Sequence, residues 1–165
     1  TYARDKDAIV ATMALCEAAA YYKTQGKTLW DAMIEMYEQF GYYKDAIQSV
    51  TMKGIEGLQK IQEIMNSLRQ NPPAEFAGHK VVAVRDYKAD TIKNLETGEV
   101  TPTGLPNSNV LYYELTNDAW VCVRPSGTEP KVKFYYGVKG TSLADADEKS
   151  AVMGKAVLDM VDSMM

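Results

Sequence analysis

Residues 110–138 read VLYYELTNDAWVCVRPSGTEPKVKFYYGV, and this stretch predicts the centre of an antiparallel sheet. Aromatic and β-branched residues, which strands prefer, fill three runs: Val110–Leu115, Trp120–Val123 and Lys131–Val138. Asn117-Asp118 stands between the first two runs, where a two-residue turn needs residues that tolerate a positive φ. We therefore expect a tight hairpin and, after an interrupting loop, a third strand.

The interrupting loop carries side chains that suit a phosphate. Arg124 offers a planar fork of N–H donors, and Ser126 and Thr128 each offer a hydroxyl. Gly127 lets a ligand approach the backbone and permits a positive φ, so that successive N–H groups can point into one concavity. Prolines at positions 125 and 130 stiffen the loop, which lowers the entropy lost when a ligand binds.

The strand after the loop adds positive charge. Side chains alternate along a strand, so Lys131, Lys133 and Tyr135 share one face. Two lysines beside the loop make a local positive site on a chain whose formal net charge is -4 and whose pI is about 5.1. Ser-Gly-Thr alone is a common turn, so the alternative to a phosphate site is a hairpin loop whose charges are solvated. The loop and the lysines together predict a phosphate site.

The rest of the chain is predicted from apolar spacing and from residues that start or stop helices. We expect a helix over 5–24, a helix over 28–40 opened by a Thr28–Asp31 capping box, an extended segment over 42–51, a helix over 53–69, a strand over 80–87 and a final helix from 142. Residues 90–109 are rich in Gly, Pro, Asn and Thr and predict a long exposed loop. The order of two helices and a β-α-β-β-β-β-α unit predicts an α+β fold, with helices on one face of an antiparallel sheet. The two parts should divide near residues 41–44.

Composition and charge narrow the function. The chain has 165 residues, of which 46% are hydrophobic and 24% charged, and this predicts a folded globular protein. The acidic balance argues against general nucleic-acid binding, and the sequence shows no membrane-spanning run, so we expect a cytoplasmic protein.

Cys16 and Cys122 lie in apolar runs and are expected to be buried, reduced thiols, and no Cys/His cluster has metal-ligand spacing. The first residue is Thr1 rather than methionine, which we interpret as a sign of a processed chain or a fragment.

Residues 123–136, VRPSGTEPKVKFYY, closely resemble the C-terminal phosphate-binding loop of the α-D-phosphohexomutase family, the family of phosphoglucomutases and phosphomannomutases. LPNSNVL (105–111) resembles the stretch before that loop in bacterial phosphoglucomutases, and RDKDA (4–8) resembles a Lys-Asp motif at the end of the family's third domain. The resemblance covers essentially the whole chain. It implies that residues 1–41 are the last helices of domain three and that residues 42–165 are domain four, which in this family has the TATA-binding-protein-like fold.

The resemblance also implies roles for single residues. The substrate phosphate that is not being transferred would be held by four loop residues: Arg124, Ser126, Gly127 and Thr128. Lys133 stands where many members have a second arginine, so the charge is kept but the bidentate fork is lost. Lys6 matches a family lysine near the reacting sugar hydroxyl, which implies a catalytic role in proton transfer.

For the whole protein the resemblance implies an isomerase, an intramolecular phosphotransferase that moves phosphate between O1 and O6 of a hexose. The reaction would pass through an enzyme phosphoserine and a hexose 1,6-bisphosphate, with Mg²⁺ bound outside this chain. The family's phosphoserine loop, Asp-rich magnesium loop and Glu-Glu-Ser sugar loop have no match here. We therefore expect the chain alone to be inactive, with the sugar phosphate and the remaining mutase domains as its partners. A phosphopentomutase of the same family, or a non-catalytic phosphate-binding module, is the alternative.

Overall fold

The computed structural model describes residues 6–52 and 54–164. The chain divides into two units, one that ends at Gly41 and one that begins at Tyr42. Among the described residues, no helix is long and apolar enough to cross a membrane. The assignment of the first unit to a third mutase domain stays a prediction.

The first unit begins with α1 (Ala8–Thr24), which a carboxylate caps. Asp7 accepts hydrogen bonds from the N–H groups of Ile9, at 3.0 Å, and Val10, at 2.9 Å, which have no acceptor inside the helix. The predicted helix start at Asp5 lies outside the described residues. Ile9 is 76% exposed, and no residue of α1 is buried.

The second helix of this unit, α2 (Leu29–Phe40), confirms the predicted capping box. The Thr28 hydroxyl accepts the N–H of Asp31 at 3.2 Å, and the Asp31 carboxylate accepts the N–H of Thr28 at 2.8 Å. Gly41 ends the helix with a positive φ of 111°, which a residue with a Cβ rarely adopts. Both ends of α2 therefore follow from local sequence.

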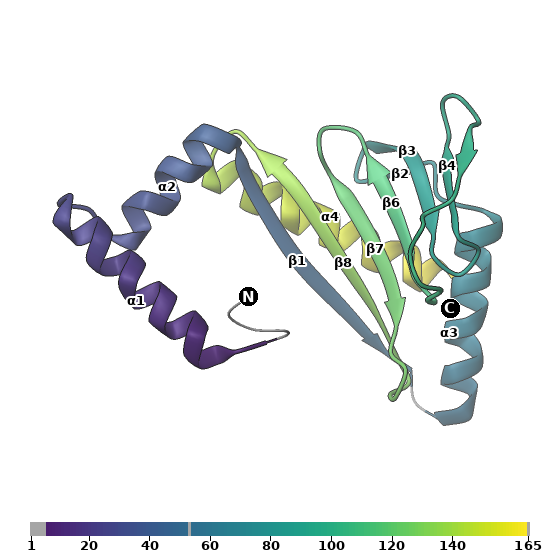
Figure 1. The fold of residues 1–165 in the computed structure, drawn as a ribbon. Coiled ribbons are helices and arrows are strands. Elements are labelled where there is room, and N and C mark those ends of the chain that lie inside the picture. The colour runs from purple at the N-terminus through teal and green to yellow at the C-terminus, as the bar shows by residue number, and fades with distance from the viewer. Residues whose placement is uncertain (1–5, 53, 165) are drawn as a thin grey trace. The chain divides into compact units, whose positions relative to one another are not determined.

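The second unit is an α+β fold with an open antiparallel sheet, as predicted (Figure 1). The strand order is β1-β8-β7-β6-β3-β4-β5, with β2 paired to β3, and every pair is antiparallel. α3 and α4 cover one face of the sheet (Figure 1). The elements are β1 (Tyr42–Thr51), α3 (Gly54–Gln70), β2 (Glu75–Phe76), β3 (His79–Asp86), β4 (Thr91–Asn94), β5 (Val100–Thr101), β6 (Leu111–Leu115), β7 (Trp120–Pro125), β8 (Lys131–Gly140) and α4 (Leu143–Ser163).

The predicted hairpin between β6 and β7 is confirmed. Asn117 and Asp118 have φ values of 63° and 57°, as the favoured two-residue hairpin turn requires. The N–H of Leu115 donates to the carbonyl of Ala119 at 2.9 Å and closes the turn. This turn fixes the register of the strand that leads to the loop at residue 124.

The prediction of one long loop over residues 90–109 is wrong. Within this segment β4 pairs with β3, and β5 pairs with β4. Asn94 turns the chain after β4, because its Oδ1 accepts the N–H of Glu96 at 2.9 Å. Strands of four and two residues are too short to show an alternating pattern in the sequence, and this is why the pattern was missed.

The sheet has one buried face and one face turned away from α3 and α4, which we call the outer face. Along β6, β7 and β8, fully buried side chains alternate with more exposed ones. The buried strand residues are Leu111, Tyr113, Leu115, Val121, Val123, Val132, Phe134, Tyr136 and Val138. Their partners on the helices are Ile61, Ile64, Met65, Leu68, Met153, Val157 and Val161.

The expectation of two buried thiols is also wrong. Cys16 is exposed on α1, whose apolar residues are not covered, and Cys122 is half-buried on the outer face of β7. Both cysteines are free. Burial raises the pKa of the Cys122 thiol, and the charge of Arg124 offsets this only in part, so the thiol stays protonated near neutral pH.

Tyr113 and Tyr112 offer a matched test of this two-faced sheet. The buried Tyr113 hydroxyl donates to the carbonyl of Leu68 at 3.1 Å and ties β6 to α3, whereas Tyr112 lies on the outer face. Tyr113→Phe should lower the free energy of unfolding by about 1–2 kcal/mol, because a buried hydrogen bond is lost. Tyr112→Phe should change it by less than about 0.5 kcal/mol. Urea unfolding followed by Trp120 fluorescence measures both, and equal effects would contradict the assignment of the two faces.

Candidate functional site

The loop predicted to bind phosphate connects β7 to β8 and is closed by its own backbone. The N–H of Ser126 donates to the carbonyl of Lys131 at 2.7 Å, and the N–H of Lys131 donates to the carbonyl of Glu129 at 2.7 Å. The carbonyl of Pro130 accepts the N–H of Met52 at 2.9 Å. The loop is therefore attached to the end of β1 as well as to its own two strands.

Two backbone N–H groups converge inside the loop. The N–H groups of Thr128 and Glu129 both point to the hydroxyl oxygen of Ser126, at 3.4 and 3.3 Å. These bonds are long, so the two N–H groups remain good donors for a stronger acceptor on that side. Gly127 does not use a positive φ here, and a Cβ at this position would meet no atom within 4 Å. The conformational freedom that glycine permits is therefore not used here, whereas the open space beside Gly127 leaves room for a ligand.

The pairing of β7 with β8 places two cations opposite each other. Arg124 and Lys133 are partners in the antiparallel register, and directly opposed residues share a face of the sheet. Within the described part of the chain, neither side chain forms a hydrogen bond or an ion pair with another residue. Lys131 instead pairs with the carboxylate of Glu129 at 3.1 Å. Two unpaired cations that face each other at the base of the loop are an arrangement that suits an anion.

The predicted alternation along β8 is confirmed. Lys131, Lys133 and Tyr135 are half-buried on the outer face, whereas Val132 and Phe134 are buried in the core. Lys133 therefore lies on the face of the sheet opposite the core.

A feature that the sequence did not show is the contribution of β1. β1 pairs with β8 so that Ser49 lies opposite Lys133 and Thr51 lies opposite Lys131. Both hydroxyl residues are exposed on the outer face. No local pattern could have indicated this, because the two strands are about eighty residues apart in sequence.

Lys6 lies in the first unit, whereas the loop lies in the second unit. It is an exposed residue that precedes α1 in the first unit. Its catalytic role stays a prediction.

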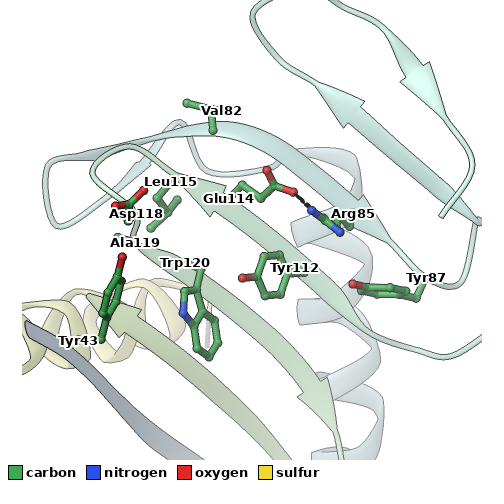
Figure 2. Close-up of a pocket in the computed structure, with 10 residues that line it drawn as sticks. All are labelled: Tyr43, Val82, Arg85, Tyr87, Tyr112, Glu114, Leu115, Asp118, Ala119 and Trp120. Carbon is green, nitrogen blue, oxygen red and sulfur yellow. Dashed lines mark hydrogen bonds and ion pairs between the residues drawn. The ribbon is translucent and has the colours of Figure 1, made fainter. Parts of the chain in front are cut away.

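A hollow elsewhere on the outer face offers a comparison with the loop (Figure 2). It has a volume of about 530 Å³ and is lined by aromatic side chains, of which Tyr112 and Trp120 stack at 5.5 Å between ring centroids. Its arginine, Arg85, pairs with Glu114 and lies 5.7 Å from the Tyr112 ring centroid (Figure 2). The bond to Glu114 raises the pKa of Arg85. Because this cation is already paired, the hollow suits an anion less well than the Arg124–Lys133 site does.

The donor set of the described residues does not suit a metal ion. In the ranges 6–52 and 54–164, no group of three or more His, Cys, Asp or Glu side chains is placed to hold one. The loop presents cations, hydroxyls and backbone N–H groups, which are the donors that an anion would need.

Comparisons with known proteins give the relatives of this chain. The sequence model of the family described as phosphoglucomutase/phosphomannomutase, C-terminal domain, matches residues 64–154. Curated phosphoglucomutases of Staphylococcus aureus strains RF122 and MSSA476 are 37% and 36% identical over 152 residues, which is 92% of this chain and 27% of each relative. The chain thus spans about a quarter of the length of the curated relatives it matches.

A solved structure shares the fold. The open form of the exocytosis-sensitive phosphoprotein pp63/parafusin from Paramecium, described as a phosphoglucomutase, aligns with 99% of this chain and 27% of its own. The TM-score is 0.57 and the sequence identity is 14%. At this identity the likeness concerns the fold alone.

Lys133→Glu tests the opposed cations directly. It replaces a cross-strand repulsion by an attraction to Arg124, so the free energy of unfolding should rise by about 0.2–1 kcal/mol at low ionic strength. The gain should shrink as salt screens the charges. Lys133→Gln removes the repulsion alone and should give a smaller gain. Urea unfolding at low and high salt measures both variants, and a destabilised Lys133→Glu chain at low salt would contradict this geometry.

Proposed function

The chain belongs to the phosphoglucomutase/phosphomannomutase family, whose C-terminal-domain model matches residues 64–154, and from this premise we propose that it holds the phosphate of a sugar phosphate in a cytoplasmic mutase. The observation that carries the proposal is the facing pair of Arg124 and Lys133, which pairs with no carboxylate of the described residues. Charge-assisted hydrogen bonds to a phosphate would satisfy both cations. The backbone N–H groups of Thr128 and Glu129 would add donors from the loop.

We propose that the phosphate bound here is the one that is not transferred. Held at the loop, it would orient the sugar so that the opposite hydroxyl or phosphate meets the reacting serine of another domain. Binding energy from a remote group that does not react can be used in this way to lower the barrier of the chemical step. The interconversion of hexose 1-phosphate and hexose 6-phosphate, through a phosphoserine and a hexose 1,6-bisphosphate, is the reaction that this proposal assigns to the whole protein.

The Mg²⁺ of this reaction is proposed to bind outside the chain. The described residues contain no cluster of three or more His, Cys, Asp or Glu side chains that could hold this ion. Lys6 is proposed to move a proton at the reacting sugar hydroxyl, which needs an amino group that the substrate can reach, and Lys6 is exposed.

The identity of the sugar is a second question, because it depends on the domains that bind the ring. The Glu-Pro-Lys-x-Lys-x-Tyr-Tyr form of the loop (129–136) also fits a phosphopentomutase. A non-catalytic phosphate-binding module is the alternative from another class. The full-length protein assayed with Mg²⁺ on glucose 1-phosphate, mannose 1-phosphate and ribose 1-phosphate decides among them. We expect turnover of glucose 1-phosphate, and no turnover of any of the three would contradict the proposed reaction.

Arg124→Ala should impair phosphate binding more than any other change in the loop. We expect the 165-residue chain to bind inorganic phosphate with a dissociation constant of about 1 mM, as suits one small anion in an open site. Loss of the guanidinium should weaken this by at least about tenfold, because two charge-assisted bonds disappear. Thr128→Val should cost less, since only one neutral hydroxyl is lost. Lys133→Arg should keep or improve binding.

The measurement is a phosphate titration followed through backbone amide signals by NMR. In the parent chain the largest shifts should come from Ser126 to Thr128. Lys93→Ala is the matched control, because it removes an exposed cation from β4, three strands away from β7. Equal binding by Arg124→Ala and Lys93→Ala would contradict the proposed site.

A further inference from the structure

Three adjacent strands bring donor side chains into two rows on the outer face. β7 pairs with β8, and β8 pairs with β1, in registers that continue straight across the three strands. The N–H of Ser126 bonds to the carbonyl of Lys131, which extends the β7–β8 register by one step into the loop. The first row is Ser126, Lys131 and Thr51, and the second row is Arg124, Lys133 and Ser49.

The spacing of these rows matches the size of a phosphate and its ligands. Directly opposed residues lie about 4.5–5.5 Å apart across a strand pair, and alternate residues lie about 6.6 Å apart along a strand. The six side chains therefore stand on an area of roughly 10 by 7 Å. Long lysine and arginine side chains can converge over the short serine and threonine side chains beside them.

The two rows contain donors and almost no competing acceptors. Within the described residues, the hydroxyls of Ser49 and Thr51 have no hydrogen-bond partner, and only Lys131 is engaged by a carboxylate. The next outer-face carboxylate on β1 is Asp45, which lies opposite Gly137, two rows further from the loop than Ser49. A carboxylate beside Lys133 would compete with a bound anion, whereas a hydroxyl can add a bond to it.

We propose that the β1 hydroxyls of Ser49 and Thr51 are further ligands of the bound phosphate. This inference rests on the proposed function of the loop. Lys133 supplies a point charge with no fixed fork, and Ser49 beside it supplies the second, directed donor that a bidentate arginine would have provided. Thr51 supplies a directed hydroxyl donor beside Lys131, whose charge also pairs with Glu129.

The attachment of the loop to β1 supports this arrangement. The bond between the N–H of Met52 and the carbonyl of Pro130, at 2.9 Å, joins the end of β1 to the end of the loop. The hydroxyl of Thr51 therefore stays next to the loop, so little ordering is needed when a phosphate binds. The phosphate site is then formed by three strands, of which β1 is the edge strand.

The test compares isosteric substitutions at Ser49. Ser49→Thr keeps the hydroxyl and Ser49→Val replaces it by a methyl group of the same shape, and both β-branched residues favour a strand. In the 165-residue chain titrated with inorganic phosphate at low salt, Ser49→Val should bind roughly fivefold more weakly than Ser49→Thr. Thr51→Val should weaken binding to a similar extent, and Thr51→Ser should not. Tyr43→Phe is the control, because it removes a hydroxyl from the outer face of β1 about 20 Å away.

The outcomes separate this inference from the proposed function. If phosphate shifts the amides of Ser126 to Thr128 in the parent chain and the valine variants are selectively weakened, the β1 ligands are supported. If those amides shift but Ser49→Val and Ser49→Thr bind equally, and Thr51→Val binds like the parent, the β1 ligands are refuted while the loop site stands. If the loop amides do not shift in the parent chain, both the loop site and the β1 ligands are refuted.

Discussion

The antiparallel pairing of β7 with β8 is the constraint on which the site depends. It makes Arg124 and Lys133 neighbours on the outer face, and the same register buries Val132 and Phe134 in the core. A slip of one residue would turn Phe134 to solvent and Lys133 toward α3 and α4. The sheet would then lose the burial of Phe134 and the solvation of the Lys133 charge. The packing of the core therefore fixes the positions of the cations. The stability of the sheet and the geometry of the candidate site therefore depend on one register.

The facing cations Arg124 and Lys133 lower the stability of the unbound protein. Two like charges opposed across a strand pair repel each other, and the described residues place no carboxylate between Arg124 and Lys133. The chain is acidic overall, with a formal net charge of -4, so the two facing cations are a local exception to its general charge. A bound phosphate would reverse the local cost by pairing with both cations. Relief of this repulsion would add to the free energy of anion binding, whereas a stabilising role alone would favour an acidic residue opposite one of the cations.

The sequence predicted the parts of the fold that rest on local signals. The hairpin at Asn117-Asp118 and the Thr28–Asp31 capping box were found because their residue types decide the backbone conformation. β4 and β5 were missed because they are too short to show a period. The neighbours of Lys133 on β1 could not be predicted, because the pairing of β1 with β8 is decided by tertiary packing between distant segments. The loop residues themselves were identified from their chemistry, and their binding role stays a prediction.

The most direct test is a crystal structure of the chain grown with selenate, a tetrahedral dianion that stands in for phosphate and is located by its anomalous scattering. We predict one strong peak on the outer face at the β7–β8 loop, within hydrogen-bonding distance of the Arg124 guanidinium and the N–H groups of Thr128 and Glu129. A peak beside Arg85 in the aromatic hollow, with none at the loop, would contradict the account. So would an Arg124 side chain turned away from Lys133 with no anion between them.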